Sequence, residues 1–237
     1  RQVFIVRELR CENPLLNLKL LGERNFGVSM AVLAIFGIGM LGGTYLLPLY
    51  MQKGLGYTAI MAGSVFLPVG LIQGVLSTCS GFLTRYIKPL FIAVTGILVM
   101  TLSFYFASRF TLHTTHAQIM LVLYLRGFGM GLTFAPLNDF SLMNLSQRDM
   151  ASAAGISNSI KQLSGSVSIA LLTVILTGRT AFHSAQGGLS SAESYVAGIS
   201  DDFLFVTFVS LASALPFLWL LRPRRKAASF KSEGTGT

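Results

Sequence analysis

The chain has 237 residues, of which 52% are hydrophobic and only 11% are charged, so its composition excludes an ordinary soluble domain. A formal net charge of +9 is common among nucleic-acid-binding proteins. The basic residues, however, lie at the ends of long apolar runs rather than on one folded face, so we expect no nucleic-acid partner.

Six apolar stretches of membrane-spanning length follow one another along the chain. They cover residues 27–50, 58–83, 90–108, 117–138, 151–177 and 201–221. At a rise of about 1.5 Å per residue, each reaches roughly across a hydrocarbon core of about 30 Å. The sequence therefore predicts an all-α integral membrane protein, a six-helix transmembrane bundle embedded in the lipid bilayer. The connection 178–200 is rich in Gly, Ser and Ala, and we expect a mobile loop there.

The segments that flank the bundle are polar. Residues 1–26 are predicted to form a cytosolic linker, and residues 222–237 a cytosolic basic tail. Within the linker, Asn13 suits the cap of a helix and Pro14 suits its first turn, and leucines follow them. Two interpretations stay open for this stretch: a short helix on the inner membrane surface, or a linker of the ordinary kind.

Basic residues are unevenly distributed between the two sets of connections. Thirteen of the eighteen Lys and Arg residues lie in the set that includes both termini. Lys53, Arg109 and Arg179 lie in the other set. Because cytoplasmic loops of membrane proteins carry an excess of Lys and Arg, we predict that both termini of this segment are cytosolic.

Two basic residues lie deep inside predicted spans. Arg126 is about 14 Å into the fourth span, and Lys161 shares one side of the fifth span with Asn158 and Gln162. A charge in the bilayer centre costs at least about 2.5 kcal/mol, and such residues usually mark a path or a site. A structural alternative stays open for each cation: Arg126 binds backbone carbonyls between helices, or Lys161 merely reaches the headgroups. The predicted substrate or coupling cavity contains Arg126, Asn138, Asn158, Lys161 and Gln162.

Three prolines inside or near the ends of spans, Pro48, Pro68 and Pro136, are predicted to bend helices during gating.

The acidic residues are all predicted to lie outside the centres of the spans. Asp201 and Asp202 are expected at the start of the sixth span, where the helix dipole favours them. The histidines, His183 among them, fall in predicted outer loops. A proton-driven transporter needs a group that titrates within the membrane, so we expect the proton carrier outside this segment.

Motifs of enzymes are absent from the sequence: there is no His-Glu-x-x-His, no Gly-x-Ser-x-Gly and no phosphate-binding loop. We therefore expect no catalytic residues, no metal site and no cofactor. The runs Phe36-Gly37-Ile38-Gly39 and Phe128-Gly129-Met130-Gly131 are each followed by a proline, which suggests three spans repeated in opposite direction, a 3+3 inverted repeat. A chance match among glycine-rich spans is the alternative.

Two blocks of sequence carry a resemblance to a known family. The first runs from Arg126 through Gly-Phe-Gly-Met-Gly-Leu-Thr-Phe-Ala-Pro-Leu to Asn138, and the second from Met150 through the Asn158-Ser-Ile-Lys161-Gln162 stretch to Ser166. Together they resemble the fourteen-span drug:proton antiporters of the major facilitator superfamily, the EmrB/QacA type. The resemblance extends over nearly the whole chain and implies half of a major-facilitator fold, the carboxy-terminal six spans.

The resemblance also implies a function. The chain is expected to be the carboxy-terminal half of a proton-coupled multidrug efflux transporter that works by alternating access in a bacterial cytoplasmic (inner) membrane. The proton gradient supplies the energy, and the substrates are hydrophobic or amphipathic small molecules. Expected partners are a missing amino-terminal transmembrane half and, in Gram-negative bacteria, a periplasmic adaptor with an outer-membrane channel. The alternative is a six-span half-transporter or the membrane subunit of an ATP-driven transporter.

Overall fold

The computed structural model describes residues 18–143, 145–147, 149–185, 188 and 190–216. In chain order its elements are η1 (Leu18–Gly22), α2 (Arg24–Leu49), η2 (Tyr50–Gly54), α3 (Ala59–Ser64), α4 (Leu67–Leu83), α5 (Pro89–Ala107), α6 (His116–Leu142), α7 (Met150–Ala185) and α8 (Ser191–Ala212). The first is a 3-10 turn, η2 is a π-helical turn, and the others are α-helices. The described residues contain no strand, so the predicted all-α class is confirmed.

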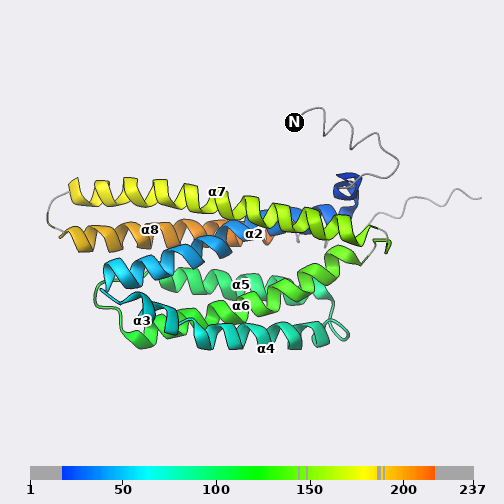
Figure 1. The fold of residues 1–237 in the computed structure, drawn as a ribbon, viewed down its shortest axis with the longest axis horizontal. Coiled ribbons are helices and arrows are strands. Elements are labelled where there is room, and N and C mark those ends of the chain that lie inside the picture. The colour runs from blue at the N-terminus through cyan, green and yellow to red at the C-terminus, as the bar shows by residue number, and fades with distance from the viewer. Residues whose placement is uncertain (1–17, 144, 148, 186–187, 189, 217–237) are drawn as a thin grey trace, which may run out of the picture.

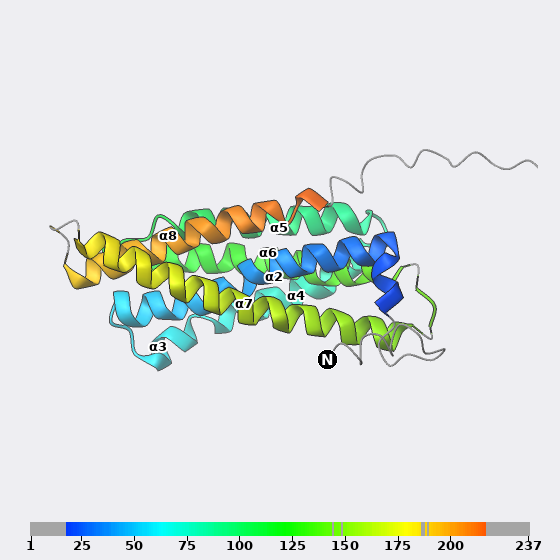
Figure 2. The same ribbon diagram turned by 90° about the horizontal axis from the view of Figure 1, so that it is seen from above.

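Six helical segments are long and apolar enough to cross a membrane. α2 with η2 forms the first segment, α3 with α4 the second, and α5, α6, α7 and α8 the remaining four. The segments run side by side along the longest axis of the molecule (Figures 1 and 2). We call the end where α2 begins the proximal end. The opposite end, with the connections that follow η2, α5 and α7, is the distal end.

The first four segments begin close to the predicted starts of the spans, and local signals mark two of these starts. The Thr58 hydroxyl accepts a hydrogen bond from the Met61 N–H at 3.3 Å, which caps α3. Thr115 and Gln118 form a reciprocal capping box at the start of α6. The second span, predicted as one helix, is interrupted at positions 65–66, shortly before Pro68. A proline there cannot donate the backbone hydrogen bond that a continuous helix needs.

The prediction of a mobile loop over residues 178–200 is wrong. α7 continues to Ala185 and α8 already begins at Ser191, so most of that stretch is helical. The helix starts at a capping box, in which the Ser190 N–H donates to the Glu193 carboxylate at 2.8 Å and the Glu193 N–H donates to the Ser190 hydroxyl at 3.2 Å. The polar composition thus reflects a capped helix end rather than a loop.

The helix of the sixth span begins at Ser191, before its predicted start at residue 201. It runs to Ala212, residues 215–216 are again helical, and residues 217–221 lie outside the described part of the chain, so the predicted end at residue 221 stays a prediction. Of the predicted linker, η1 and the first residues of α2 are described, so the predicted surface helix is represented only by the short turn Leu18–Gly22. Residues 1–17 and the predicted basic tail, 222–237, lie outside the described residues.

Glycines bring helix backbones close together. A Cβ atom placed on Gly96 of α5 would lie 2.9 Å from the Gly129 carbonyl oxygen of α6. On α2, a Cβ at Gly37 would lie 3.0 Å from Ser164 of α7, and on α6 a Cβ at Gly131 would lie 2.7 Å from Leu76 of α4. α2 thus packs on α7 as α6 packs on α4. This is the arrangement expected when the first and last three spans are equivalent sets in a 3+3 inverted repeat.

An aromatic cluster holds the distal end together. The Tyr50 ring stacks on Phe110 with 4.8 Å between ring centroids, and the Tyr50 hydroxyl donates to the Thr111 carbonyl at 2.7 Å. Phe203 of α8 contacts Phe110 edge-on, with centroids 6.3 Å apart. The first span, the α5–α6 connection and the last span therefore share one buried core at this end.

Candidate functional site

A cavity of about 190 Å³ lies between α2, α6 and α7, toward the proximal end of the bundle. Its lining consists of Leu33, Phe134, Asn138, Ser141, Leu142, Ala154, Ser157, Asn158 and Lys161. The structure therefore brings three of the predicted site residues together, Asn138 and Asn158 as amides and Lys161 as the cation. Both asparagines are exposed on the surface of the bundle, so the cavity opens outward.

Lys161 faces an aromatic wall of this cavity. Its Nζ atom lies 5.5 Å from the centroid of the Phe134 ring, a cation–π distance. Among the described residues, the ion pairs involve Asp201 and none involves Lys161. An ammonium group without a carboxylate partner, beside two amides and an aromatic ring, can bind a ligand that combines an apolar body with a hydrogen-bond acceptor.

Arg126 lies apart from this cavity, in the contact between α6 and α2. Its side chain is buried, and its Nη2 atom donates to the Met40 carbonyl at 3.0 Å and to the Thr44 hydroxyl. Met40 is about 10 Å further along α2 than the cavity residue Leu33, at the helical rise. This contact agrees with the alternative in which Arg126 binds backbone carbonyls between helices. The Nε and Nη1 atoms are buried without a hydrogen-bond partner.

The other predicted site residues are dispersed. Gln162 is exposed on α7 and does not line the cavity. Pro48 lies inside α2, shortly before the backbone becomes π-helical at Tyr50, and Pro68 lies at the start of α4. Pro136 lies inside α6, which continues to Leu142. A gating role for these prolines stays a prediction.

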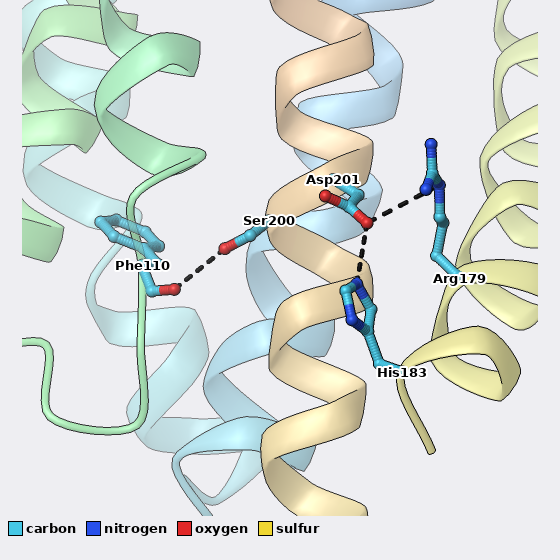
Figure 3. Close-up of polar contacts among 5 residues, drawn as sticks. All are labelled: Phe110, Arg179, His183, Ser200 and Asp201. Atoms are coloured by element: carbon cyan, nitrogen blue, oxygen red, sulfur yellow. Dashed lines mark hydrogen bonds and ion pairs between the residues drawn. The ribbon is translucent and has the colours of Figure 1, made fainter. Parts of the chain in front are cut away.

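A group of charged residues near the distal end was missed by the sequence analysis. Asp201 accepts from His183 Nε2 at 2.9 Å, and Arg179 Nε lies 3.6 Å from the same carboxylate oxygen (Figure 3). The adjacent Ser200 hydroxyl donates to the Phe110 carbonyl at 2.9 Å. His183, predicted in a loop, lies in the last turn of α7. These contacts join α7, α8 and the α5–α6 connection.

Asp202 departs most from the sequence prediction. It lies in the middle of α8 rather than at its start, and it is 0% exposed. Neither carboxylate oxygen has a hydrogen-bond partner among the described residues. The expectation that all acidic residues avoid the span centres is therefore wrong. The Ser190-x-x-Glu193 capping pattern could have located the helix start, and with it the depth of Asp202.

No group of three or more metal-ligating side chains occurs in the part of the chain that the structure describes.

Comparisons with known proteins identify the family. The family model of the Major Facilitator Superfamily matches residues 4–169. YhcA, an uncharacterised MFS-type transporter of Bacillus subtilis, is 32% identical over 183 residues, which cover 77% of this chain and 34% of the relative. The multidrug export protein EmrB of Haemophilus influenzae is 31% identical over 184 residues, covering 77% of this chain and 36% of the relative. The lincomycin resistance protein LmrB of Listeria innocua is 26% identical over 226 residues, which cover 94% of this chain and 48% of the relative.

The chain thus spans between 34% and 48% of the length of these relatives. Its six long apolar helices make it a multi-pass membrane protein, and its arrangement agrees with the matched family. The chain belongs to the Major Facilitator Superfamily.

Proposed function

We propose that this chain is the carboxy-terminal half of a proton-coupled multidrug efflux transporter that works by alternating access. The observation that carries the proposal is the cavity lined by Asn138, Asn158, Lys161 and Phe134, between a helix of the first set of spans and two of the second. Polar groups of this kind in an otherwise apolar bundle are costly unless they line a path or bind a ligand. Relatives named for multidrug export and lincomycin resistance agree with this assignment.

The size of the cavity supports a binding site that is shared with another half. Pockets for drug-sized molecules usually measure roughly 300–1,000 Å³. The cavity here has about 190 Å³ and opens at the bundle surface. A second set of helices facing it would enlarge and enclose it. The proposed ligands are hydrophobic or amphipathic molecules, whose apolar part contacts Phe134 and Leu33 while a polar group meets Lys161.

Exposed apolar side chains support a missing amino-terminal transmembrane half. On α4, Leu67 is 71% and Leu71 is 73% exposed, and on α7 Leu163 is 66% and Val174 is 71% exposed. In a membrane protein such residues contact either lipid or other helices. We place the partner half against these two helices, and hydrocarbon chains against the remaining apolar surface.

The proposed orientation follows from the positions of the charges. Lys53, Arg109 and Arg179 are near the distal end, whereas Arg85 and Lys88 belong to a proximal connection, on the side of the basic termini. We therefore place the proximal end in the cytosol and the protein in a bacterial inner membrane. In a Gram-negative host, a periplasmic adaptor and an outer-membrane channel would meet the distal end.

The function is tested with the full-length protein in a bacterial strain that lacks its own drug exporters. We expect lower ethidium accumulation than in the empty-vector strain, and restoration of accumulation by a protonophore. Inhibition of ATP synthesis, with the proton gradient maintained by respiration, should leave efflux intact. Efflux that survives the protonophore and stops on ATP depletion would instead support the ATP-driven alternative.

The site is tested with Lys161→Ala in the same strain. Loss of a charged contact that is worth about 1.4 kcal/mol in the transported complex slows initial efflux roughly tenfold. Arg85→Ala, an exposed cation at the α4–α5 connection, is the matched control and should leave the rate unchanged. Equal rates for Lys161→Ala and the wild type, at equal protein levels, would remove Lys161 from the site.

A further inference from the structure

The carboxyl group of Asp202 is enclosed within this half of the protein. The residue is 0% exposed, and both of its side-chain oxygens are buried without a hydrogen-bond partner among the described residues. The neighbouring Asp201, in contrast, is 34% exposed at its side chain and is paired with His183 and Arg179. Because the six helices described here already bury Asp202, its enclosure does not depend on any further set of spans.

Charged and titratable groups occur on several of the segments beside α8. On α7, Arg179 and His183 bind Asp201 instead. From the α5–α6 connection, Arg109 and His113 line a cavity with Glu193 and Asp201. From η2, Lys53 lies over the Tyr195 ring at 5.6 Å, and Tyr45 of α2 hydrogen-bonds Thr173 at 3.2 Å. No ion pair with Asp202 is formed by the described residues.

An ionised carboxylate in this position would be very costly. Transfer of a charge into apolar surroundings without a partner costs several kcal/mol or more, and such a group becomes neutral instead. A proton is the smallest cation that removes the charge, and it needs no additional space. The enclosed geometry therefore fits the neutral acid.

A cavity with several polar lining residues lies beside this region, toward the distal end. A cavity of about 410 Å³ between α2, α7 and α8 is lined by Tyr45, Lys53, Thr180 and Tyr195, among others. Tyr195 lies two helical turns before Asp202 on the same face of α8. Thr180 packs against Gly198, one turn before Asp202, and its buried hydroxyl also lacks a partner. Separation of α7 from α8 along this contact would bring water to the carboxyl group.

From this geometry we propose that Asp202 is a proton-binding site within the carboxy-terminal half. The carboxylate takes up one proton from the distal aqueous side and becomes a carboxylic acid, which is the state of the enclosed conformation. It releases the same proton when another conformation exposes it to the other side, and no other bond changes. The inference rests on the proposed proton-coupled function, but protonation itself can be measured without transport.

The first test is infrared difference spectroscopy of the full-length protein in liposomes during a pH titration. A protonated carboxyl group gives a carbonyl stretch that an ionised one lacks. We expect Asp202→Asn to lose one component of this band and the matched neighbour Asp201→Asn to keep it. Asp202→Glu, which retains a titratable group, should restore a component. Identical bands in the wild type and Asp202→Asn would overturn the proposal. Replacement of sodium by choline at constant pH should leave the band unchanged. A band that changes with sodium would mean that Asp202 binds the metal cation, and this result would also overturn the proposal.

The second test separates this proposal from the proposed function. Drug-evoked proton movement across the liposome membrane should be lost in Asp202→Asn and retained in Asp201→Asn. Proton movement in Asp202→Asn equal to that of the wild type would overturn the role of Asp202 while leaving proton-coupled efflux intact. A wild-type protein that moves no drug but shows the Asp202 band would overturn the function and leave the proton site in place.

Discussion

Arg126 combines an anchoring contact with an unfavourable environment. Its Nη2 atom binds the Met40 carbonyl of α2, but two further guanidinium nitrogens are buried without partners. A buried charge whose hydrogen-bonding groups are only partly satisfied is costly, so an apolar residue of similar volume at this position removes that cost. We therefore expect Arg126→Met to keep or raise the unfolding temperature of the purified full-length protein. If the buried charge serves the transport path rather than the helix contact, the same change strongly reduces efflux.

The control for Arg126→Met is Arg126→Ala, which leaves a cavity and should lower the unfolding temperature. A purely anchoring role makes the opposite prediction for Arg126→Met. The unfolding temperature would then fall by several degrees, and efflux per folded molecule would stay at the wild-type level. Thermal unfolding followed by fluorescence, combined with drug efflux at matched protein levels, decides between the two roles.

Individual residues show how far sequence reasoning reaches. Lys161, Asn158 and Asn138 could be placed near each other because helical periodicity and the short loop between the fourth and fifth spans fix their relative positions. Arg126 is buried in the bundle, as its place inside a long apolar run indicates, but its partner on α2 depends on tertiary packing that no local pattern encodes. The depth of Asp202 was misjudged because polar residues precede it on the same helix.

At the scale of helices, close packing at glycine is open to a direct test. A methyl group at Gly96 would meet the Gly129 carbonyl oxygen and the Thr133 backbone nitrogen, each at 2.9 Å. Because backbone atoms cannot move aside cheaply, we expect Gly96→Ala to force α5 and α6 apart and to cost about 1–3 kcal/mol. Denaturant unfolding of the purified full-length protein would measure the loss.

Gly178→Ala is the matched control on α7. A Cβ atom there meets nothing within 4 Å, and alanine in a helix is more favourable than glycine by up to about 1 kcal/mol. The control should therefore be neutral or slightly stabilising. Equal free energies of unfolding for the two variants would show that the α5–α6 contact is looser than the structure indicates.

The helices also show where sequence signals mislead. The first four spans could be placed closely, since their apolar runs coincide with their helices. The glycine runs that suggested an inverted repeat do not make equivalent contacts: Gly37 meets Ser164 of α7, whereas Gly129 meets Gly96 of α5. The packing of α2 on α7 and of α6 on α4 supports the repeat better than the motif does.

At the scale of the whole molecule, the exposed apolar side chains of α4 and α7 predict strong dependence on a second set of helices. Expressed alone, this chain should be degraded or retained at low levels in the membrane. Co-expression with the remaining spans as a separate polypeptide should restore its level and drug efflux, and affinity purification of one piece should recover the other. A chain that is stable alone and forms discrete homodimers would favour the half-transporter alternative.

The overall fold was the most accessible part of the sequence prediction. A six-helix bundle of this superfamily can be predicted from length, hydropathy and the two blocks around Arg126 and Lys161. The reason is that the bilayer requires each long apolar run to form a spanning helix, whatever its neighbours are. The cavity lining, the distal ion pairs and the enclosure of Asp202 depend on which helix faces lie against each other. That information arises only when the helices pack.

The distal connections differ in how well they should tolerate an inserted epitope tag, because the α5–α6 connection packs against Tyr50. A tag inserted at Thr111 would displace the carbonyl that accepts a hydrogen bond from the Tyr50 hydroxyl, and it would disturb the stacking of Tyr50 on Phe110. Gly188, in contrast, has a positive φ of 118° and nothing within 4 Å of its added Cβ position. A tag at Gly188 should leave the bundle intact, and antibody access to it in intact cells would report which side of the membrane this end occupies.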